Sequence, residues 1–130
     1  HREAHTCVLV EHAAPHCYSN QHFKSLVRSY GKASFYGTIY VHPEAQKTDA
    51  YQLSNALLLD EKAVAFSEPN LRIFADDVKA THGATVGQLD QEQLFYLRAR
   101  GLPLKEAKEL LVQGFASEIL GEIPCSISLK

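Results

Sequence analysis

Short apolar bursts separated by turn-forming residues occupy the chain up to about Leu89. The bursts are rich in β-branched and aromatic side chains, and Gly, Pro, Asn, Asp and Ser lie between them. This pattern is typical of short strands joined by tight turns. We expect eight strands, over Thr6–Glu11, Ser25–Ser29, Ala33–His42, Gln52–Leu59, Ala63–Ser67, Leu71–Ala75, Val78–Thr81 and Thr85–Leu89.

Five turns are expected between these strands, at Tyr30-Gly31-Lys32, His42-Pro43-Glu44, Glu68-Pro69-Asn70, Asp76-Asp77 and His82-Gly83. No connecting segment is long enough for an ordinary helical crossover. The sheets are therefore antiparallel, or each coil returns through short turns as in a β-solenoid. The pattern alone leaves both arrangements open.

The hydrophobic period changes after Leu89. Asp90, followed three residues later by Gln93, resembles a capping box, so a helix is expected to begin there and to end near Arg100, before Gly101. A second helix follows Pro103 and ends at Gly121, with an apolar stripe of Leu104, Ala107, Leu111, Phe115 and Ile119. The chain thus reads as a β body over residues 1–89 and a helical subdomain over residues 90–130.

Composition and charge narrow the function classes. With 45% hydrophobic and 22% charged residues, a chain of 130 residues can build one core. The 13 Lys and Arg against 15 Asp and Glu leave a net charge of -2, so nucleic acid and anionic membranes are poor partners. No apolar run is long enough to span a bilayer.

The cysteine count and the first residues of the chain add two expectations. Three cysteines without a CxxC pair, Cys7, Cys17 and Cys125, suit a reducing compartment, so a cytoplasmic location is expected. The chain opens on His1 and contains no Met, which indicates a fragment of a longer protein.

Metal-ligand side chains crowd the first 22 positions: His5, Cys7, His12, His16, Cys17 and His22. Zinc sites are strongly indicated by two close ligand pairs at regular spacing, which this segment lacks. We therefore interpret these residues as solvated strand-end and loop side chains, with a metal site as the weaker hypothesis.

Enzymatic motifs are sparse. Asp76 and Asp77 are neighbours that would point to opposite faces of a strand, so they are expected to cap a turn. The GxxxG of Gly83 and Gly87 lacks the following Lys and Ser or Thr of a phosphate-binding loop. No nucleophile or metalloprotease motif is present in the sequence.

Four consecutive large apolar residues, Leu94 to Leu97, exceed what one buried helix stripe uses. Either some of them face a partner, or the hairpin lies flat on the β body and buries most of its circumference. The sequence does not choose between these interpretations.

Several segments together resemble the SufB/SufD family of iron–sulfur cluster assembly proteins. They are Lys47–Gln52, Asn55–Leu59, Pro69–Lys79, His82–Asp90 and Gln93–Gly101. The match runs from about His12 to Ile123 in fixed order, and the segment THGATVGQLD is similar to the SufD branch. Family members are several times longer than this chain.

The resemblance implies a mainly β fold with C-terminal α structure, namely part of a right-handed parallel β-helix followed by a helical hairpin. Residues 1–89 would be the C-terminal part of the β-helix core. The implied function is that of a non-catalytic scaffold subunit, which pairs with a SufB-like subunit and docks the SufC ATPase.

The same resemblance suggests site residues. His82 is a candidate cluster ligand at the SufB–SufD interface, although Ala80 stands where the family often has Cys. Leu94, Phe95, Tyr96, Arg98 and Arg100 are candidates for the ATPase-docking surface, as apolar anchors with an Arg rim. No metal is expected in the fragment alone, and an iron–sulfur cluster is expected transiently in the full complex.

Two further hypotheses stay open. A stand-alone β-solenoid enzyme acting on carbohydrate is the alternative function, with Glu68, Asp76 and Asp77 as its available carboxylates. A cut solenoid also exposes strand edges, so a homodimer of the fragment is expected.

Overall fold

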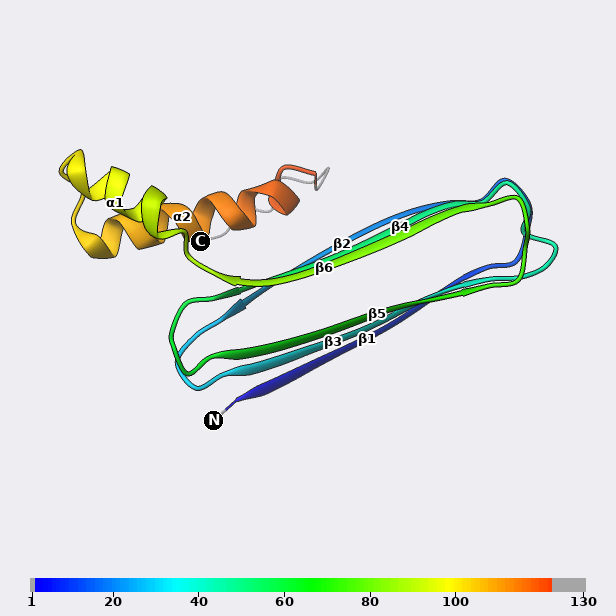
Figure 1. Cartoon of the computed structure of the whole chain (residues 1–130), viewed down its shortest axis with the longest axis horizontal. Coiled ribbons are helices and arrows are strands. Elements are labelled where there is room, and N and C mark those ends of the chain that lie inside the picture. The colour runs from blue at the N-terminus through cyan, green and yellow to red at the C-terminus, as the bar shows by residue number, and fades with distance from the viewer. Residues whose placement is uncertain (1, 123–130) are drawn as a thin grey trace. The chain divides into compact units, whose positions relative to one another are not determined.

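The computed structural model describes residues 2–122 and divides the chain into two compact units, His1–Gln88 and Leu89–Lys130. Within residues 2–122, the first unit contains six strands and the second contains two helices (Figure 1). Their bounds are β1 Glu3–His12, β2 Tyr18–Val27, β3 Lys32–Val41, β4 Asp49–Leu58, β5 Val64–Ile73, β6 Lys79–Gln88, α1 Gln91–Ala99 and α2 Leu104–Leu120.

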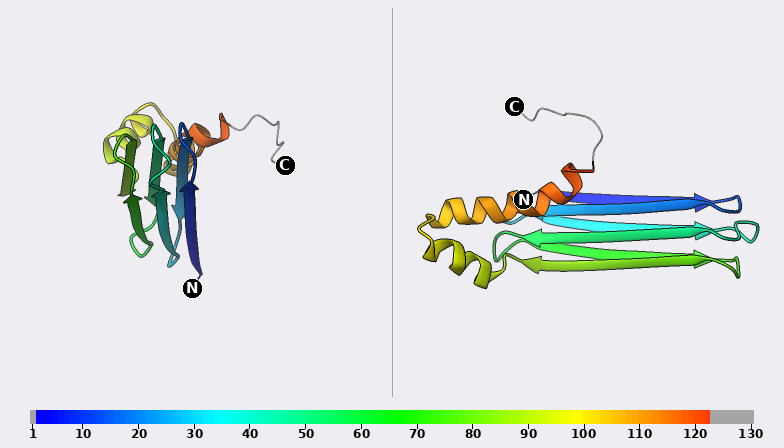
Figure 2. Two further views of the ribbon diagram at one scale, coloured as in Figure 1. Left: turned by 90° about the vertical axis from the view of Figure 1, so that its right-hand side faces the viewer. Right: turned by 90° about the horizontal axis from the view of Figure 1, so that it is seen from above.

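All strand pairs in the first unit are parallel. One sheet has the order β1-β3-β5 and the other β2-β4-β6, and the chain alternates between them at every turn (Figures 1 and 2). Each successive pair of strands therefore forms one coil that stacks on the previous coil. Of the two arrangements that the sequence left open, the parallel β-helix is confirmed, and antiparallel sheets are wrong.

The expected number of strands is wrong because two expected turns are absent. Most of Ala63–Ser67 and the first part of Leu71–Ala75 belong to one strand, β5, which runs through Pro69 and ends at Ile73. Because β5 is at the edge of its sheet in residues 2–122, the missing N–H of proline is tolerated there. Likewise, β6 runs unbroken through His82 and Gly83.

A third difference concerns the second strand. Strand β2 begins at Tyr18 instead of Ser25, because pairing with β4 extends it through the polar segment before Lys24. Backbone pairing with a neighbouring coil requires no apolar alternation, so the sequence pattern does not reveal this part of the strand.

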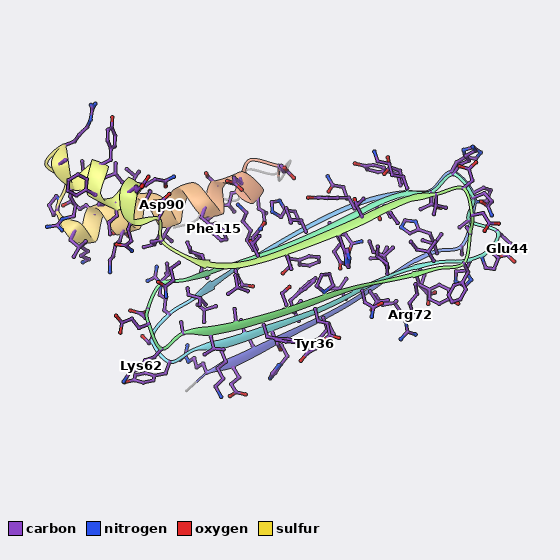
Figure 3. All side chains as sticks on the ribbon, in the orientation of Figure 1. Tyr36, Glu44, Lys62, Arg72, Asp90 and Phe115 are labelled. Carbon is purple, nitrogen blue, oxygen red and sulfur yellow. The ribbon has the colours of Figure 1, made fainter. Side chains whose placement is uncertain are left out.

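The core lies between the two sheets. On β3 the residues Phe35, Gly37, Ile39 and Val41 are buried, and on β4 the residues Ala50, Gln52, Ser54 and Ala56 are buried. The period of two identifies these positions as the inward faces of the strands. The rings of Phe23 on β2 and Phe35 on β3 have centroids 4.7 Å apart, which connects the sheets. Tyr36 of β3 and Arg72 of β5 lie on the outer side of the sheet β1-β3-β5 (Figure 3).

Backbone hydrogen bonds continue the stacking through the turns. The amide of His16 donates to the Gln46 carbonyl at 2.8 Å, and the amide of Lys47 donates to the Asp77 carbonyl at 2.6 Å. His16 and Lys47 both have positive φ, at 59° and 63°. The three turns therefore form a ladder of their own, and Asp77 takes part in it as a turn residue.

The second unit is a helical hairpin whose ends follow the sequence signals. The Asp90 carboxylate accepts hydrogen bonds from the amides of Glu92 and Gln93, at 2.8 and 3.2 Å. At the other end of α1, Gly101 has φ 96°, and the Leu102 amide donates to the Leu97 carbonyl. These bonds satisfy helix-terminal groups that would otherwise lack partners. In residues 2–122 neither helix is long and apolar enough to cross a membrane.

Candidate functional site

His82 lies in the middle of β6, where its backbone pairs in register with Gln52 of β4. The expectation that it stands at a turn between two short strands is wrong, because the ladder with β4 runs through this segment without interruption. Strand β6 is at the edge of its sheet in residues 2–122, so no further strand covers the imidazole. The His82 side chain is exposed.

The face of β6 that carries His82 is the inward one. Ala80, two residues before it, packs against the core cluster that includes Ile39, Val41 and Ala50. Residues two apart on a strand share a face, so His82 is on the side of β6 that faces the solenoid interior. The His82 side chain therefore lies on the inner face of its sheet. It is exposed to solvent because β6 is the edge strand of that sheet in residues 2–122.

One polar ladder crosses the three coils at this level. Gln21 of β2 pairs in register with Gln52, and Gln52 pairs with His82. The Gln52 Nε2 group donates to Gln21 Oε1 at 2.9 Å, and the Gln52 side chain is fully buried. Gln52 was not among the site residues predicted from the sequence. The available signal was its spacing of two from the small residues Ala50 and Ser54, which share its face.

A complete cluster site is not formed by residues 2–122. No group of three or more His, Cys, Asp or Glu side chains lies close enough together there to hold a metal ion. His82 offers one imidazole nitrogen, and the small Ala80 side chain on the same face has no ligand atom. A cluster carried as cargo at this edge would take its remaining ligands from elsewhere.

The helical unit presents an apolar surface around Phe95 and Tyr96. Phe95 is 75% exposed and Tyr96 is 55% exposed, on the two middle turns of α1. The Arg100 guanidinium lies 4.8 Å from the centre of the Tyr96 ring. Leu94 differs from its neighbours because it is buried, with 7% exposure. Leu94 is therefore a core residue of the helical unit and is not part of the exposed apolar surface.

Behind these aromatic residues the two helices enclose an open pocket of about 850 Å³. Its lining is mainly apolar and comes entirely from the hairpin: Gln91, Glu92, Gln93, Phe95, Tyr96, Leu97, Ala99, Leu110 and Leu111. Leu110, one of the lining residues, is 48% exposed. A pocket of this composition suits the insertion of an apolar side chain from a protein partner.

The His and Cys residues near the N-terminus are dispersed by the fold. His5 and Cys7 are exposed on the outer face of β1, His16 is in a turn, and His22 bonds to Asn55 through Nε2 at 2.8 Å. Strand geometry separates these side chains onto different faces and elements. Cys125 lies outside the described residues.

His12 departs from the expectation of solvated histidines. It occupies the inward face at the end of β1, is 4% exposed, and is hydrogen-bonded through Nε2 to the Ser19 hydroxyl at 2.9 Å. Desolvation by burial lowers the pKa of His12 below its ordinary value of 6.5. Within the structure it is a core residue that favours the neutral imidazole.

The carboxylates considered for a carbohydrate-active enzyme do not converge. Glu68 is on the outer face of β5, whereas Asp76 and Asp77 lie in the following turn. The strand from Glu68 to its end at Ile73 alone spans about 17 Å at the usual rise per residue. Glycosidase carboxylates are about 5 to 10 Å apart, so this set cannot flank one glycosidic bond.

Two features thus define the class of protein: a parallel β-solenoid with an edge histidine, and a helical hairpin with an exposed aromatic surface. The family model of the SufBD core domain of the SUF system for FeS cluster assembly matches residues 1–115. The chain belongs to this SufB/SufD family. The resemblance seen in the sequence is confirmed.

Curated relatives agree with this assignment. The chain is 44% identical over 114 residues to the iron–sulfur cluster assembly protein SufD of Escherichia coli. This match covers 88% of this chain and 27% of the relative. It is 43% identical over 122 residues to an iron–sulfur cluster assembly SufBD family protein of Synechocystis, covering 94% of this chain and 26% of the relative. SufD of Bacillus subtilis is 42% identical over 90 residues, 69% of this chain and 21% of that protein. The chain thus spans about a quarter of the length of these relatives.

Proposed function

We propose that this chain acts in iron–sulfur cluster assembly as part of a SufD-like, non-catalytic scaffold subunit. The observation that carries the proposal is the family match over residues 1–115, together with relatives that bear the name SufD. The structure supports it by presenting two separate surfaces suited to partners. These are the β6 edge with His82 and the aromatic surface on α1.

The proposed partner at the helical surface is a SufC-like ATPase. Phe95 and Tyr96 are exposed aromatic anchors beside a pocket, and Arg98 and Arg100 provide a cationic rim. Aromatic and Arg side chains dominate the binding free energy of many interfaces. Leu94 is assigned a supporting role, because its buried side chain fixes the position of α1.

Exchange of Phe95 for Asp tests this partner. A charged carboxylate at the centre of an apolar interface is expected to abolish co-purification of the ATPase. Leu120→Asp is the matched control, since Leu120 is 49% exposed on α2 and does not line the pocket. Helical content is checked by circular dichroism. Retained ATPase binding by a folded Phe95→Asp protein would exclude this surface.

The second proposed partner is a SufB-like subunit at the β6 edge. Strand β6 has no neighbour on one side in residues 2–122, and such an edge can pair with another chain. His82 on this strand would then supply one ligand to a cluster completed by the partner. A neutral imidazole is a suitable ligand for iron.

Cluster content in the complex with SufB and SufC tests His82. His82→Ala is expected to lower iron content and the visible absorbance of the cluster, while the complex stays assembled. Thr81→Ala is the control, since Thr81 is an exposed neighbour on the opposite face of β6. Unchanged iron content in an assembled His82→Ala complex would return His82 to a structural role.

In the absence of a SufB-like partner, we propose that two copies of this chain associate through their exposed strand edges to form a homodimer. Strands β5 and β6 are edge strands in the described part of the chain. Light scattering at increasing concentration is expected to show a dimer or larger species. A strict monomer at high concentration would contradict the proposal.

A further inference from the structure

Gln52 carries a buried polar atom without a partner. Among residues 2–122, its Oε1 has no hydrogen-bond donor, although the side chain is fully buried and its Nε2 already donates to Gln21. A buried amide oxygen that has lost water and gained no donor costs free energy. This atom is thus an acceptor that is available to a donor side chain on a neighbouring strand.

The opposite sheet keeps space for this amide. Gly37 lies on β3, in the opposite sheet, and a Cβ added there would lie 2.2 Å from Gln52 Oε1 and 2.7 Å from a carbon of the Phe35 ring. Any side chain at position 37 would have to displace the amide or the ring. Glycine at this position therefore allows Gln52 to project into the interior.

The neighbour of Gln52 on the next coil is His82. The two residues pair in register on parallel strands and share the inward face, so their Cα atoms are separated by one strand spacing of about 4.8 Å. Both side chains are long enough to meet across that spacing. His82 is exposed, so its imidazole is free to turn toward the glutamine.

We propose that Gln52 is a positioning residue for His82, with Gln52 Oε1 accepting a hydrogen bond from His82 Nδ1–H. Nδ1 is the ring nitrogen closer to the backbone, and in a ring that is turned toward β4 it faces the Gln52 amide. Donation from Nδ1 fixes the tautomer in which Nε2 carries a free lone pair directed away from the coil. Histidines that bind metals commonly donate their other N–H to an acceptor in this way.

This inference rests on the proposed function, in which Nε2 is the atom offered to a cluster. It also explains why a lone imidazole at an exposed edge would be useful as a ligand. Without an acceptor the ring would exchange between tautomers and orientations. Held by Gln52, it presents one nitrogen in one direction.

The test is the tautomeric state of His82, read by two-bond nitrogen–proton NMR correlations on the chain labelled with ¹⁵N-histidine. His82→Gln assigns the signals. At a pH where the ring is neutral, Nδ1–H is expected to be the major tautomer of His82. A major Nε2–H tautomer in the unmodified protein would overturn the proposal without any variant.

Removal of the acceptor gives the second readout. In Gln52→Leu, Nε2–H is expected to become the major tautomer of His82, because an unconstrained imidazole prefers that form. Gln52→Met replaces this variant if the leucine protein does not fold. Ser54→Ala is the control, because Ser54 is a buried polar residue of the same strand that pairs with Ala84. An unchanged tautomer in a folded Gln52 variant also refutes the role.

The outcome is separable from that of the cluster experiment. If His82→Ala leaves cluster content unchanged, the proposed ligand role fails, whereas the NMR result still reports whether Gln52 orients the ring. If the ligand role holds and the tautomer does not depend on Gln52, only the positioning role fails.

Discussion

The rings of Phe23 and Phe35 lie 4.7 Å apart at an angle of 42°, one from each sheet of the solenoid. Phe35 is 5% exposed, whereas Phe23 is half-buried. The two residues are twelve positions apart in sequence and meet only because the chain reverses into the next coil. This contact joins sheets that share no backbone ladder, so side-chain packing determines their separation.

Phe35→Ala is expected to lower the free energy of unfolding by about 3 kcal/mol or more, because it removes a buried ring and leaves a cavity. Urea unfolding followed by circular dichroism measures the change. Tyr36→Ala is the matched control, since Tyr36 is 43% exposed on the outer face of the same strand. Equal losses for both variants would contradict the placement of the core.

Gly37→Ala is expected to destabilise the β unit by about 1 to 3 kcal/mol through overpacking against Gln52 and Phe35. Gly87→Ala offers a close comparison, because a Cβ at that position meets no atom within 4 Å. The second variant should be neutral or slightly stabilising, since alanine loses less backbone entropy than glycine on folding. Thermal unfolding of the two proteins separates these outcomes.

The buried His12 predicts a pH-dependent stability. Its pKa is lowered in the folded state by burial, from an ordinary value of 6.5, so the unfolded chain binds more protons than the folded chain as pH falls below that value. The contribution of His12 is therefore fully present above pH 6.5 and is lost as pH decreases through the folded pKa. Urea midpoints measured from pH 8 to pH 5 should fall.

His12→Gln should reduce the part of this pH dependence that belongs to His12, because glutamine does not titrate. His5→Gln is the control at an exposed position on the same strand. A pH profile that is identical in the His12 variant and the unmodified protein would show that other groups cause the loss.

Asp90→Ala is expected to cost about 1 kcal/mol of helix stability, because the amides of Glu92 and Gln93 lose their acceptor. Faster hydrogen exchange at these amides reports the loss locally. Asp76→Ala removes the same charge at an exposed bend and should leave α1 unchanged. No difference between the two variants would mean that water replaces the cap at no cost.

The hairpin was predictable from the sequence because its signals are local. Asp90 caps the amides two and three residues ahead, and Gly101 adopts the positive φ that ends α1. Such interactions involve only a few consecutive residues, so the local amino-acid sequence determines them. The exposed aromatic residues Phe95 and Tyr96 were also recognisable, but only the tertiary structure shows that Leu94 beside them is buried.

In the β unit the sequence by itself determined the approximate places of most strands. Its resemblance to segments of a known family also indicated the family to which the chain belongs. It did not reveal that Pro69 and Gly83 lie inside strands, since both residues favour turns locally and are overruled by pairing with β3 and β4. Only the tertiary structure placed Gln52 beside His82, thirty positions later in the chain. The physical reason is that a solenoid brings together residues one coil apart, and its register is set by backbone ladders and interior packing that no short segment contains.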